Sequence, residues 1–190
     1  MSTPNSRGRP RDPDVEARIA EAVSGLLASE GYAATTIEKV ARRSGIGRPT
    51  IYRRYTDRHA MVVSVVEQLI ERHGPPPDHL EDPEANVLNH LNSTVALLVG
   101  SPIGPIFRAV LSELPNHPEL AALVGQLGQS RRRRLQAAVR HAVAAQVLRP
   151  GSELEPAIDA LVGAIYFRFL MTGRPLDERY VRALLATIKL

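Results

Sequence analysis

Signals that start and stop helices recur along the whole chain and constrain its fold more than any other feature. A cap followed by proline, which suits the first turn of a helix, occurs three times: Asp82-Pro83, Ser101-Pro102 and His117-Pro118. Further starts come from two capping-box pairs and two single aspartate caps: Thr35 with Glu38, Ser152 with Glu155, Asp57 and Asp177. No segment shows sustained alternation of apolar and polar residues. The sequence therefore predicts an all-α protein of about nine helices, four before the linker Pro75-Pro76-Pro77 and five after it.

Length and residue usage exclude several classes of protein. With 190 residues, 44% of them hydrophobic, the chain can bury a core but is short for two large independent domains. It contains no cysteine, which excludes disulfides, thiolate nucleophiles and cysteine-ligated metals. The N-terminus is polar, and the longest apolar run, 160–167, is far below the ~20 residues of a membrane helix. We expect a soluble, cytoplasmic protein with no membrane contact.

Positive charge is concentrated in the first third of the chain. Residues 1–60 contain eleven Lys and Arg against seven Asp and Glu, whereas residues 61–190 contain thirteen of each, so the formal charge of +4 lies in the first part. Between positions 39 and 58 there are seven basic residues and one acid, Asp57. Such a patch is typical of a site for a polyanion, although charge alone fits a solvated helix face equally well.

Two short helical segments joined by a glycine-containing turn, behind a longer first segment, predict a helix-turn-helix. In the second short segment, Ile51 and Tyr55 lie four residues apart and point inward together with Ile46 from the turn. Tyr52 lies at the border, and the outward residues are Arg48, Pro49, Thr50, Arg53 and Arg54. Guanidinium groups bind phosphate or guanine in bidentate fashion, and Thr and Tyr hydroxyls reach phosphates. A two-turn helix of this kind fits the major groove of DNA.

The same segment resembles a known family. Four stretches carry the resemblance: TTIEKVA (35–41), SGI (44–46), RPTIYRRY (48–55) and DR (57–58). Together they resemble the N-terminal domain of tetracycline-repressor-like (TetR) transcriptional regulators. The resemblance implies a dimeric regulator with a divergent C-terminal ligand-binding domain, usually released from DNA by a small molecule. One departure is Gly47, where the family often has a Ser that caps the recognition helix; glycine is also accepted at such a cap.

The resemblance further implies roles for individual residues. Thr36 and Tyr52 would touch phosphates, Arg58 would lie near the DNA backbone, and the residues facing the groove would be Arg48, Pro49, Thr50 and Arg54. With Arg53 from the outward face, these residues form the predicted DNA-binding set. The predicted divisions of the chain are a basic tail (1–12), a DNA-binding domain with its linking helix (13–73), and a ligand-binding and dimerisation domain (78–190). The basic residues of the tail, between 7 and 11, either add an arm in the minor groove or take no part.

The segment 154–171 is apolar nearly all round, which predicts a partner subunit. Past its first turn only Asp159 and Arg168 are charged. A helix without a polar face must be covered on both sides, and so short a chain has too few layers to do this alone; the alternative is a central core helix of a monomer. In the TetR family this helix and the last one form a four-helix dimer interface. The predicted interface residues are Ile158, Leu161, Ile165, Arg168, Leu184, Leu185 and Ile188.

The remaining helices are expected to enclose any effector cavity. We expect a largely apolar effector with one or two polar groups, although most apolar residues of this kind belong to ordinary core. The predicted pocket residues are Leu91, Ile103, Phe107, Leu111, Leu123, Leu127, Tyr166 and Met171.

Four consecutive arginines, 131–134, interrupt an apolar helical stripe. Four helical residues span about 300° around the axis, so they cannot share one face. The stripe passes through positions 131 and 134, so at least one of Arg131 and Arg134 points inward and needs a carboxylate partner. We interpret the run as solvated or salt-bridged. Contact with a ligand anion and contact with DNA are the alternatives.

Nothing in the sequence indicates an enzyme. The six histidines form no metal-binding spacing, and there is no nucleophile elbow or phosphate loop, so we predict no catalytic residue, metal or cofactor. We expect a homodimeric, ligand-responsive repressor that binds an inverted-repeat operator in double-stranded DNA. The alternatives are a DNA-binding protein without an effector and an enzyme or carrier that uses the C-terminal helical pocket.

Overall fold

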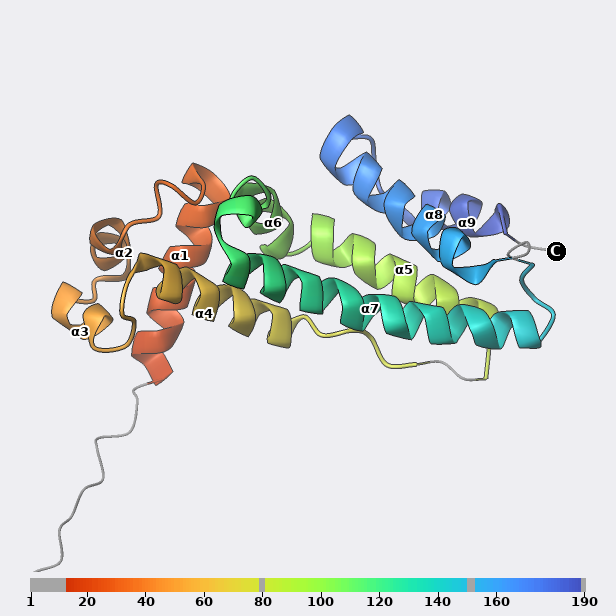
Figure 1. Ribbon diagram of the computed structural model, residues 1–190, viewed down its shortest axis with the longest axis horizontal. Coiled ribbons are helices and arrows are strands. Elements are labelled where there is room, and N and C mark those ends of the chain that lie inside the picture. Colours follow the sequence, from red (N-terminus) through yellow and green to blue (C-terminus); the bar gives the residue numbers. More distant parts are fainter. Residues whose placement is uncertain (1–12, 79–80, 150–152, 189–190) are drawn as a thin grey trace, which may run out of the picture. The chain divides into compact units, whose positions relative to one another are not determined.

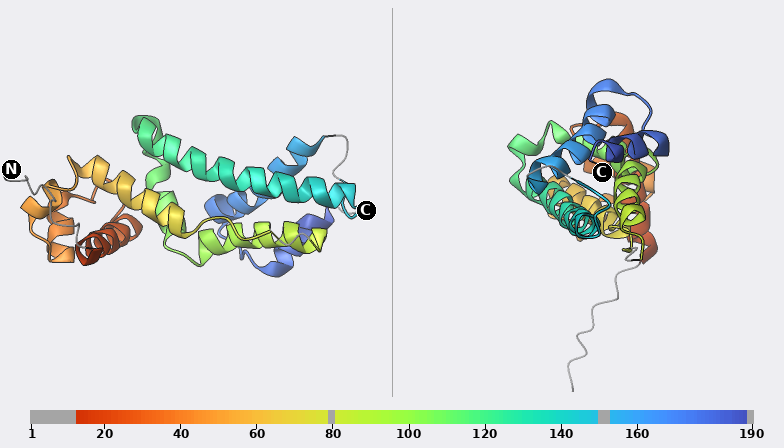
Figure 2. Two further views of the ribbon diagram at one scale, coloured as in Figure 1. Left: turned by 90° about the horizontal axis from the view of Figure 1, so that it is seen from below. Right: turned by 90° about the vertical axis from the view of Figure 1, so that its right-hand side faces the viewer.

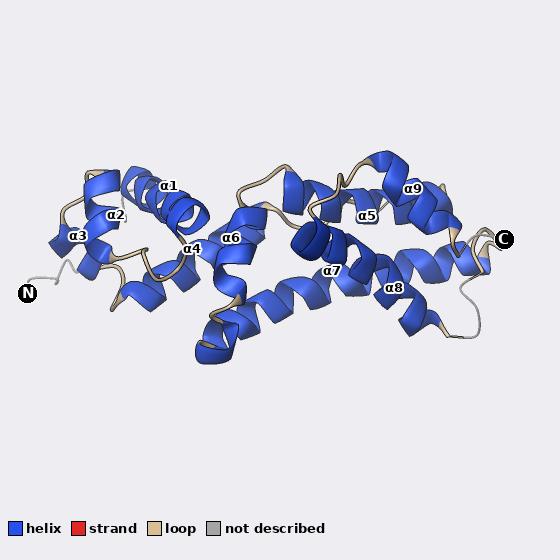
Figure 3. Cartoon of the chain, turned by 90° about the horizontal axis from the view of Figure 1, so that it is seen from above, coloured by secondary structure: helices blue, strands red, loops and turns tan. Residues whose placement is uncertain are grey.

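The computed structural model describes residues 13–78, 81–149 and 153–188, in which helices are joined by loops and no strand occurs (Figures 1 and 3). Nine α-helices in this part of the chain confirm the all-α prediction. The predicted tail 1–12 lies outside the described residues. Among the described residues no single helix is long and apolar enough to cross a membrane; only Pro83–Val99 taken together with Ile103–Leu111 has that length and composition, with a bend of 73° between them.

The first of two compact units ends at Val66. It contains α1 (Pro13–Glu30), α2 (Ile37–Ser44), α3 (Arg48–Tyr52) and the first part of α4 (Arg58–Arg72). These helices bury a set of apolar side chains, each with no exposed surface: Ile19, Val23, Leu27, Val40, Ile51, Met61, Val62 and Val65. Burying such a side chain contributes about 1.5–3 kcal/mol, so the packing of α2 on α1 and of α3 on α2 stabilises the two short helices.

The cap of α2 lies one residue later than predicted. Thr36 is the N-cap, and its hydroxyl accepts a hydrogen bond from the Lys39 N–H at 3.3 Å. Thr35 is fully buried, and its hydroxyl donates to the Gly31 carbonyl at 2.8 Å. The buried side chain of Thr35 thus points back to the end of α1, where Gly31 has a left-handed conformation (φ +83°).

The turn between α2 and α3 depends on Gly45, whose φ of +69° lies in the left-handed region. Arg18 of α1 donates from Nη2 to the Ser44 carbonyl at 2.6 Å, and the same Nη2 would lie 2.7 Å from a Cβ at position 45. Gly47 follows in an ordinary extended conformation (φ −61°) and caps α3 without a side-chain hydrogen bond. The turn therefore needs glycine at position 45 but not at position 47.

The second unit runs from Glu67 and begins with the end of α4. It contains α5 (Pro83–Val99), α6 (Ile103–Leu111), α7 (Pro118–Ala144), α8 (Leu154–Phe167) and α9 (Glu178–Ala186). Helices α5 and α7 pack against each other in opposite directions, α8 contacts both, and α9 contacts α5 and α8 (Figures 1 and 2). The centre of the core consists of Val87, Leu91, Val139, Ala142, Ile158, Leu161, Ile165, Val181 and Leu185.

Several predicted helix starts of this unit are confirmed. Asp82 caps α5 by accepting from the Ala85 N–H at 2.9 Å, and Asp177 caps α9 by accepting from the Tyr180 N–H at 2.8 Å. Pro118 is the first residue of α7, as expected. In the first unit Asp57 likewise accepts from the Ala60 N–H at 2.8 Å.

Two starts differ from the prediction. Helix α6 begins at Ile103 rather than Pro102, because the Ser101 hydroxyl accepts from the Ile103 N–H at 3.1 Å. Helix α8 begins after Glu153, which makes no side-chain cap bond, and the predicted cap Ser152 lies outside the described residues. At its other end α8 continues into a π-helical turn, Arg168–Thr172.

Replacing Gly45 by Ala is expected to lower the free energy of unfolding of the first unit by about 1–2 kcal/mol. The left-handed conformation costs a side chain roughly that amount, and Arg18 must also move. The matched control is Gly47→Ser, where φ suits any residue and a hydroxyl can cap α3. Urea unfolding followed by circular dichroism should show the control at wild-type stability or slightly above it. Equal stability of Gly45→Ala and the wild type would contradict this account of the turn.

Candidate DNA-binding surface

Helix α3 presents an inward and an outward face in the predicted phase. Ile51 has no exposed surface, and Tyr55 and Ile46 are each 8% exposed. On the other side Tyr52 is 52% exposed. The neighbouring outward residues Arg48, Pro49 and Arg53 are also exposed, whereas Thr50 and Arg54 are half-buried.

Polar groups on the outward face bond to one another within a single turn. The Thr50 hydroxyl accepts from Arg53 Nη2 at 3.1 Å, and Arg54 Nη1 donates to the Thr50 carbonyl at 3.4 Å. The Nε of Arg54 is buried and has no hydrogen-bond partner among the described residues. Arg54 therefore lies back along α3, and contact with a base edge requires its side chain to rotate outward.

Thr36 and Arg58, two predicted contacts from outside α3, are held in place by their own partners. The Thr36 hydroxyl accepts the cap bond from the Lys39 N–H. Such a hydroxyl can still donate its own proton to a second partner such as phosphate. Arg58 Nη1 donates to the Ala33 carbonyl at 3.1 Å, and its guanidinium carbon lies 4.7 Å from the centre of the Tyr32 ring. These contacts position a positive charge at the start of α4.

Helix α2 adds basic side chains that the predicted set omits. Arg42 and Arg43 are exposed, and Lys39 pairs with Glu30 of α1. The hydrogen bond from Lys39 lowers the pKa of the Glu30 carboxyl. The signal for these residues was present in the sequence, because all three belong to the basic run between 39 and 58. In the structure Lys39 is paired with a carboxylate, whereas Arg42 and Arg43 are exposed.

Two family models match the chain. The one described as "Bacterial regulatory proteins, tetR family" matches residues 19–65, and the one described as "Tetracyclin repressor-like, C-terminal domain" matches residues 75–188. The second match alone covers more than half of the chain. The protein belongs to the TetR family of transcriptional regulators. The match over residues 19–65 falls on α1 to α4 and assigns a DNA-binding helix-turn-helix to the protein; α3 is its candidate recognition helix.

Individual relatives support this assignment. The chain is 26% identical over 181 residues to the HTH-type transcriptional regulator YdeS of Bacillus subtilis (strain 168), across 95% of this chain and 90% of YdeS. Its sequence is 30% identical to that of the TetR family transcription regulator SCO0332. The crystal structure of SCO0332 matches with a TM-score of 0.61, across 92% of this chain and 96% of SCO0332. The flavonoid-responsive regulator FrrA has the same fold at 17% identity, with a TM-score of 0.69 and coverage of 92% and 93%.

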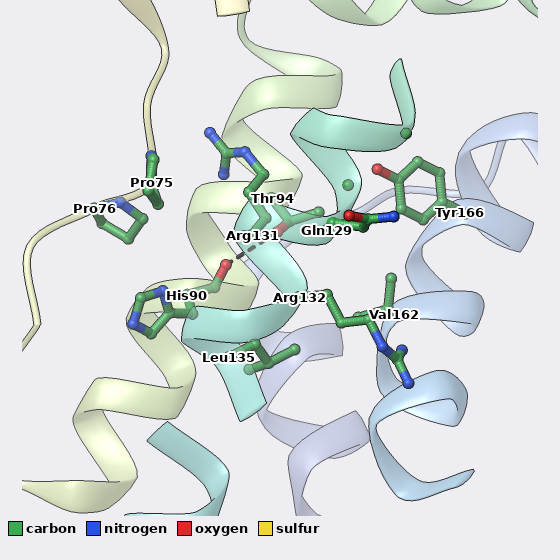
Figure 4. A pocket seen from close by; sticks show the side chains of 12 residues that line it. Pro75, Pro76, His90, Thr94, Gln129, Arg131, Arg132, Leu135, Val162 and Tyr166 are labelled. Atoms are coloured by element: carbon green, nitrogen blue, oxygen red, sulfur yellow. Dashed lines mark hydrogen bonds between the residues drawn. The ribbon is translucent and has the colours of Figure 1, made fainter. Parts of the chain in front are cut away.

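The second unit of this TetR-family protein contains a cavity of about 360 Å³ (Figure 4). Three helices and the chain after α4 line it, through Pro75, Thr94 of α5, Arg131 and Leu135 of α7, and Val162 and Tyr166 of α8. Tyr166 is the one predicted pocket residue that lines this cavity.

The other predicted pocket residues do not gather there. Leu91 and Ile103 are buried, with 1% and 6% of their surface exposed, whereas Leu111 and Met171 are 38% and 73% exposed. The ring centres of Phe107 and Tyr166 lie 5.7 Å apart. Leu123 and Leu127 are half-buried. Apolar periodicity identifies the inward face of a helix, but it does not distinguish a side chain packed in core from one beside an empty space.

The predicted dimer residues need a correction. Ile158, Leu161, Ile165 and Leu185 are at most 1% exposed and pack in the core of their own chain, so they cannot form the surface offered to a partner. Leu184 and Ile188 pack partly against the same core. Arg168 lies 3.6 Å from the Tyr180 ring centre and donates to the Pro175 carbonyl at 2.8 Å.

The opposite side of α8 carries a different stripe. Ala160, Gly163 and Phe167 are exposed there, and Met171 follows in the π-helical turn. Phe167 is 59% exposed. The chain covers one side of its apolar helix and leaves the other side open.

The arginine run separates into members with different partners. Arg131 is the inward one, but it bonds to Ser93 Oγ and the Gly74 carbonyl, each at 3.2 Å, and to the His73 carbonyl. The predicted carboxylate partner is therefore wrong for Arg131, because backbone oxygens after α4 take that place. Arg132 pairs with Glu155 and Asp159 of α8, and Arg134 is 3.8 Å from Asp78.

Tyr52→Ala and Arg48→Ala are each expected to weaken DNA binding by about 1–3 kcal/mol, because each removes a contact from the exposed face of the recognition helix. Binding is measured by fluorescence anisotropy with a duplex recovered from random DNA by its affinity for the protein. Arg140→Ala is the matched control, since it removes one exposed charge from α7 of the second unit. Wild-type affinity in both α3 variants would refute the assignment of the recognition face.

Proposed function

We propose that this protein is a dimeric, ligand-responsive repressor that binds an inverted-repeat operator. The observation that carries the proposal is the outward face of α3, where arginines and the Tyr52 hydroxyl are presented by a helix anchored through Ile51 and Tyr55. Two such helices, one from each subunit, would enter successive major grooves roughly 34–36 Å apart. Function on an operator would place the protein in the cytoplasm, and the proposed role is not catalytic.

The open side of α8 supports the dimer. Ala160 and Gly163 have small side chains that allow another helix to approach closely, and Phe167 and Met171 add exposed apolar surface beside them. An exposed apolar stripe of this kind on one helix face marks an interaction site. A second copy of α8 is the proposed occupant, as expected for the family.

The cavity supports the response to a ligand. A small-molecule site is a concave, mostly apolar space with a few polar groups, in the range of about 300–1,000 Å³, and the cavity of the second unit has about 360 Å³. This open space favours a ligand-responsive regulator over a DNA-binding protein without an effector. The name of the relative FrrA states that it responds to flavonoids, and response to some small molecule is proposed here. A ligand with different affinities for the DNA-binding and the released states would shift the population between them.

Selection of bound duplexes from random-sequence DNA tests the operator. The recovered sequences should form an inverted repeat with half-sites centred about 10–10.5 base pairs, or a multiple of that, apart. The Arg48→Ala variant serves as the control, because it should enrich these sequences less. Recovery of a single unrepeated half-site would contradict binding as a symmetric dimer.

Phe167→Glu is expected to give monomers in sedimentation velocity, because it places a charge in the centre of the proposed interface. The helical circular dichroism signal should not change, since Phe167 is 59% exposed in the single chain. The matched control is Val99→Glu, which adds the same charge at a side chain of the same unit that is 60% exposed and should leave the dimer intact. A stable Phe167→Glu dimer would place the interface elsewhere.

A further inference from the structure

We propose that the cavity of the second unit binds an organic anion with an apolar body, and that Arg131 supplies the positive charge that selects it. The proposed function supplies the context, because such a molecule would be the effector. The inference adds the charge and the shape of the ligand to that function.

One cationic side chain of the cavity lining, Arg131, differs from the others in its partners. Arg132 is paired with Glu155 and Asp159, and His90 shares a hydrogen bond of 2.9 Å with Asp78. Arg131 has no acidic partner among the described residues: its hydrogen-bond acceptors are one hydroxyl and two backbone carbonyls. Arg131 is therefore a cation of the lining that has no carboxylate of the described residues bonded to it.

The environment of Arg131 makes this charge costly without a counter-ion. The side chain is half-buried, and desolvation lowers the pKa of its guanidinium. Its Nε is fully buried and has no hydrogen-bond partner among the described residues. A buried charge without an opposite charge is unfavourable, so an anion inside the cavity stabilises this arrangement more than a neutral or cationic molecule does.

Tyr166 offers a hydrogen-bond donor on the other side of the cavity. Figure 4 shows it reaching from α8 toward α7, with Arg131 extending from α7 toward Pro75. Burial raises the pKa of the Tyr166 hydroxyl, so this group stays protonated and has an O–H to donate. A carboxylate or similar acidic group accepts from such a donor and from a guanidinium at once.

The rest of the lining fits an apolar body. Leu135 and Val162 provide aliphatic wall, and Gly125 and Gly128 of α7 line the cavity without side chains. A Cβ added at either glycine would have no atom within 4 Å, so both glycines border open space. Glycine inside a helix is destabilising relative to alanine, and here the two glycines widen the cavity.

A pair of fluorescent probes tests the charge. 8-Anilinonaphthalene-1-sulfonate is an anion, and N-phenyl-1-naphthylamine has the same ring skeleton without the sulfonate. The wild-type protein should bind the sulfonate at least tenfold more tightly than the neutral amine in fluorescence titrations without DNA. Equal or tighter binding of the neutral amine would overturn the proposal.

Variants of Arg131 separate charge from structure. Arg131→Gln should weaken binding of the sulfonate at least tenfold and change binding of the amine less than threefold. Arg131→Lys loses the same guanidinium geometry but keeps the charge, so it should bind the sulfonate at least fivefold more tightly than Arg131→Gln. Arg140→Gln, the matched loss of an exposed charge on α7, should bind both probes like the wild type. Equal losses in the Lys and Gln variants would overturn the role of the charge.

A filled cavity tests the location. Gly128→Ala should weaken binding of both probes several-fold while the melting temperature stays unchanged or rises, because alanine favours the helix. Unchanged binding of both probes in this variant would show that they bind elsewhere and would overturn the assignment of the cavity.

The same experiments distinguish this inference from the proposed function. If the sulfonate binds with the predicted dependence on Arg131 but organic anions never change operator affinity, the anion site stands and the effector role fails. If the sulfonate does not bind with this dependence on Arg131 but operator affinity responds to neutral molecules, the ligand-responsive repressor stands and the anion site fails.

Discussion

The candidate DNA-binding surface depends on the burial of one side chain, Ile51. Helix α3 has five residues, and a helix of that length has no stability of its own because nucleation costs more than so few hydrogen bonds return. Ile51, with no exposed surface, packs α3 onto the rest of the first unit, and Tyr55 holds the residue after its end. The direction of every outward side chain on α3 follows from this anchor.

The first unit was predictable because its constraints are local. The spacing of Ile51 and Tyr55 sets the phase of α3. The turn at the left-handed Gly45 and the cap at Asp57 each depend on residues next to them in the sequence. The exact cap of α2 was missed by one residue, because the choice between Thr35 and Thr36 depends on burial of Thr35 against the end of α1. That contact depends on tertiary packing, and a capping-box pattern does not predict which of the two threonines is buried.

The second unit was predictable only in outline, because its site depends on which faces of several helices meet. Helix α8 illustrates this limit. Its all-round apolar composition predicts cover on both sides, but it does not show that Ile158, Leu161 and Ile165 face the chain's own core while Phe167 faces outward. Apart from Tyr166, the residues that line the cavity were missed for a related reason: two of them, Gly125 and Gly128, border it without a side chain.

Arg131 connects the cavity with the end of α4, the helix that begins in the first unit and ends in the second. Its Nη2 bonds to the carbonyls of His73 and Gly74, the two residues directly after that helix. A guanidinium has five N–H groups in a fixed plane, so an anion that draws Arg131 toward the cavity competes with these carbonyls for the same donors. A ligand can bind the two arrangements, with and without these bonds, with different free energies. If it binds more tightly to the arrangement without them, it stabilises that arrangement of the chain after α4 by the difference in binding free energy. Arg131, the residue proposed to select the ligand by its charge, thus also bonds the wall of the cavity to His73 and Gly74, the segment that follows α4.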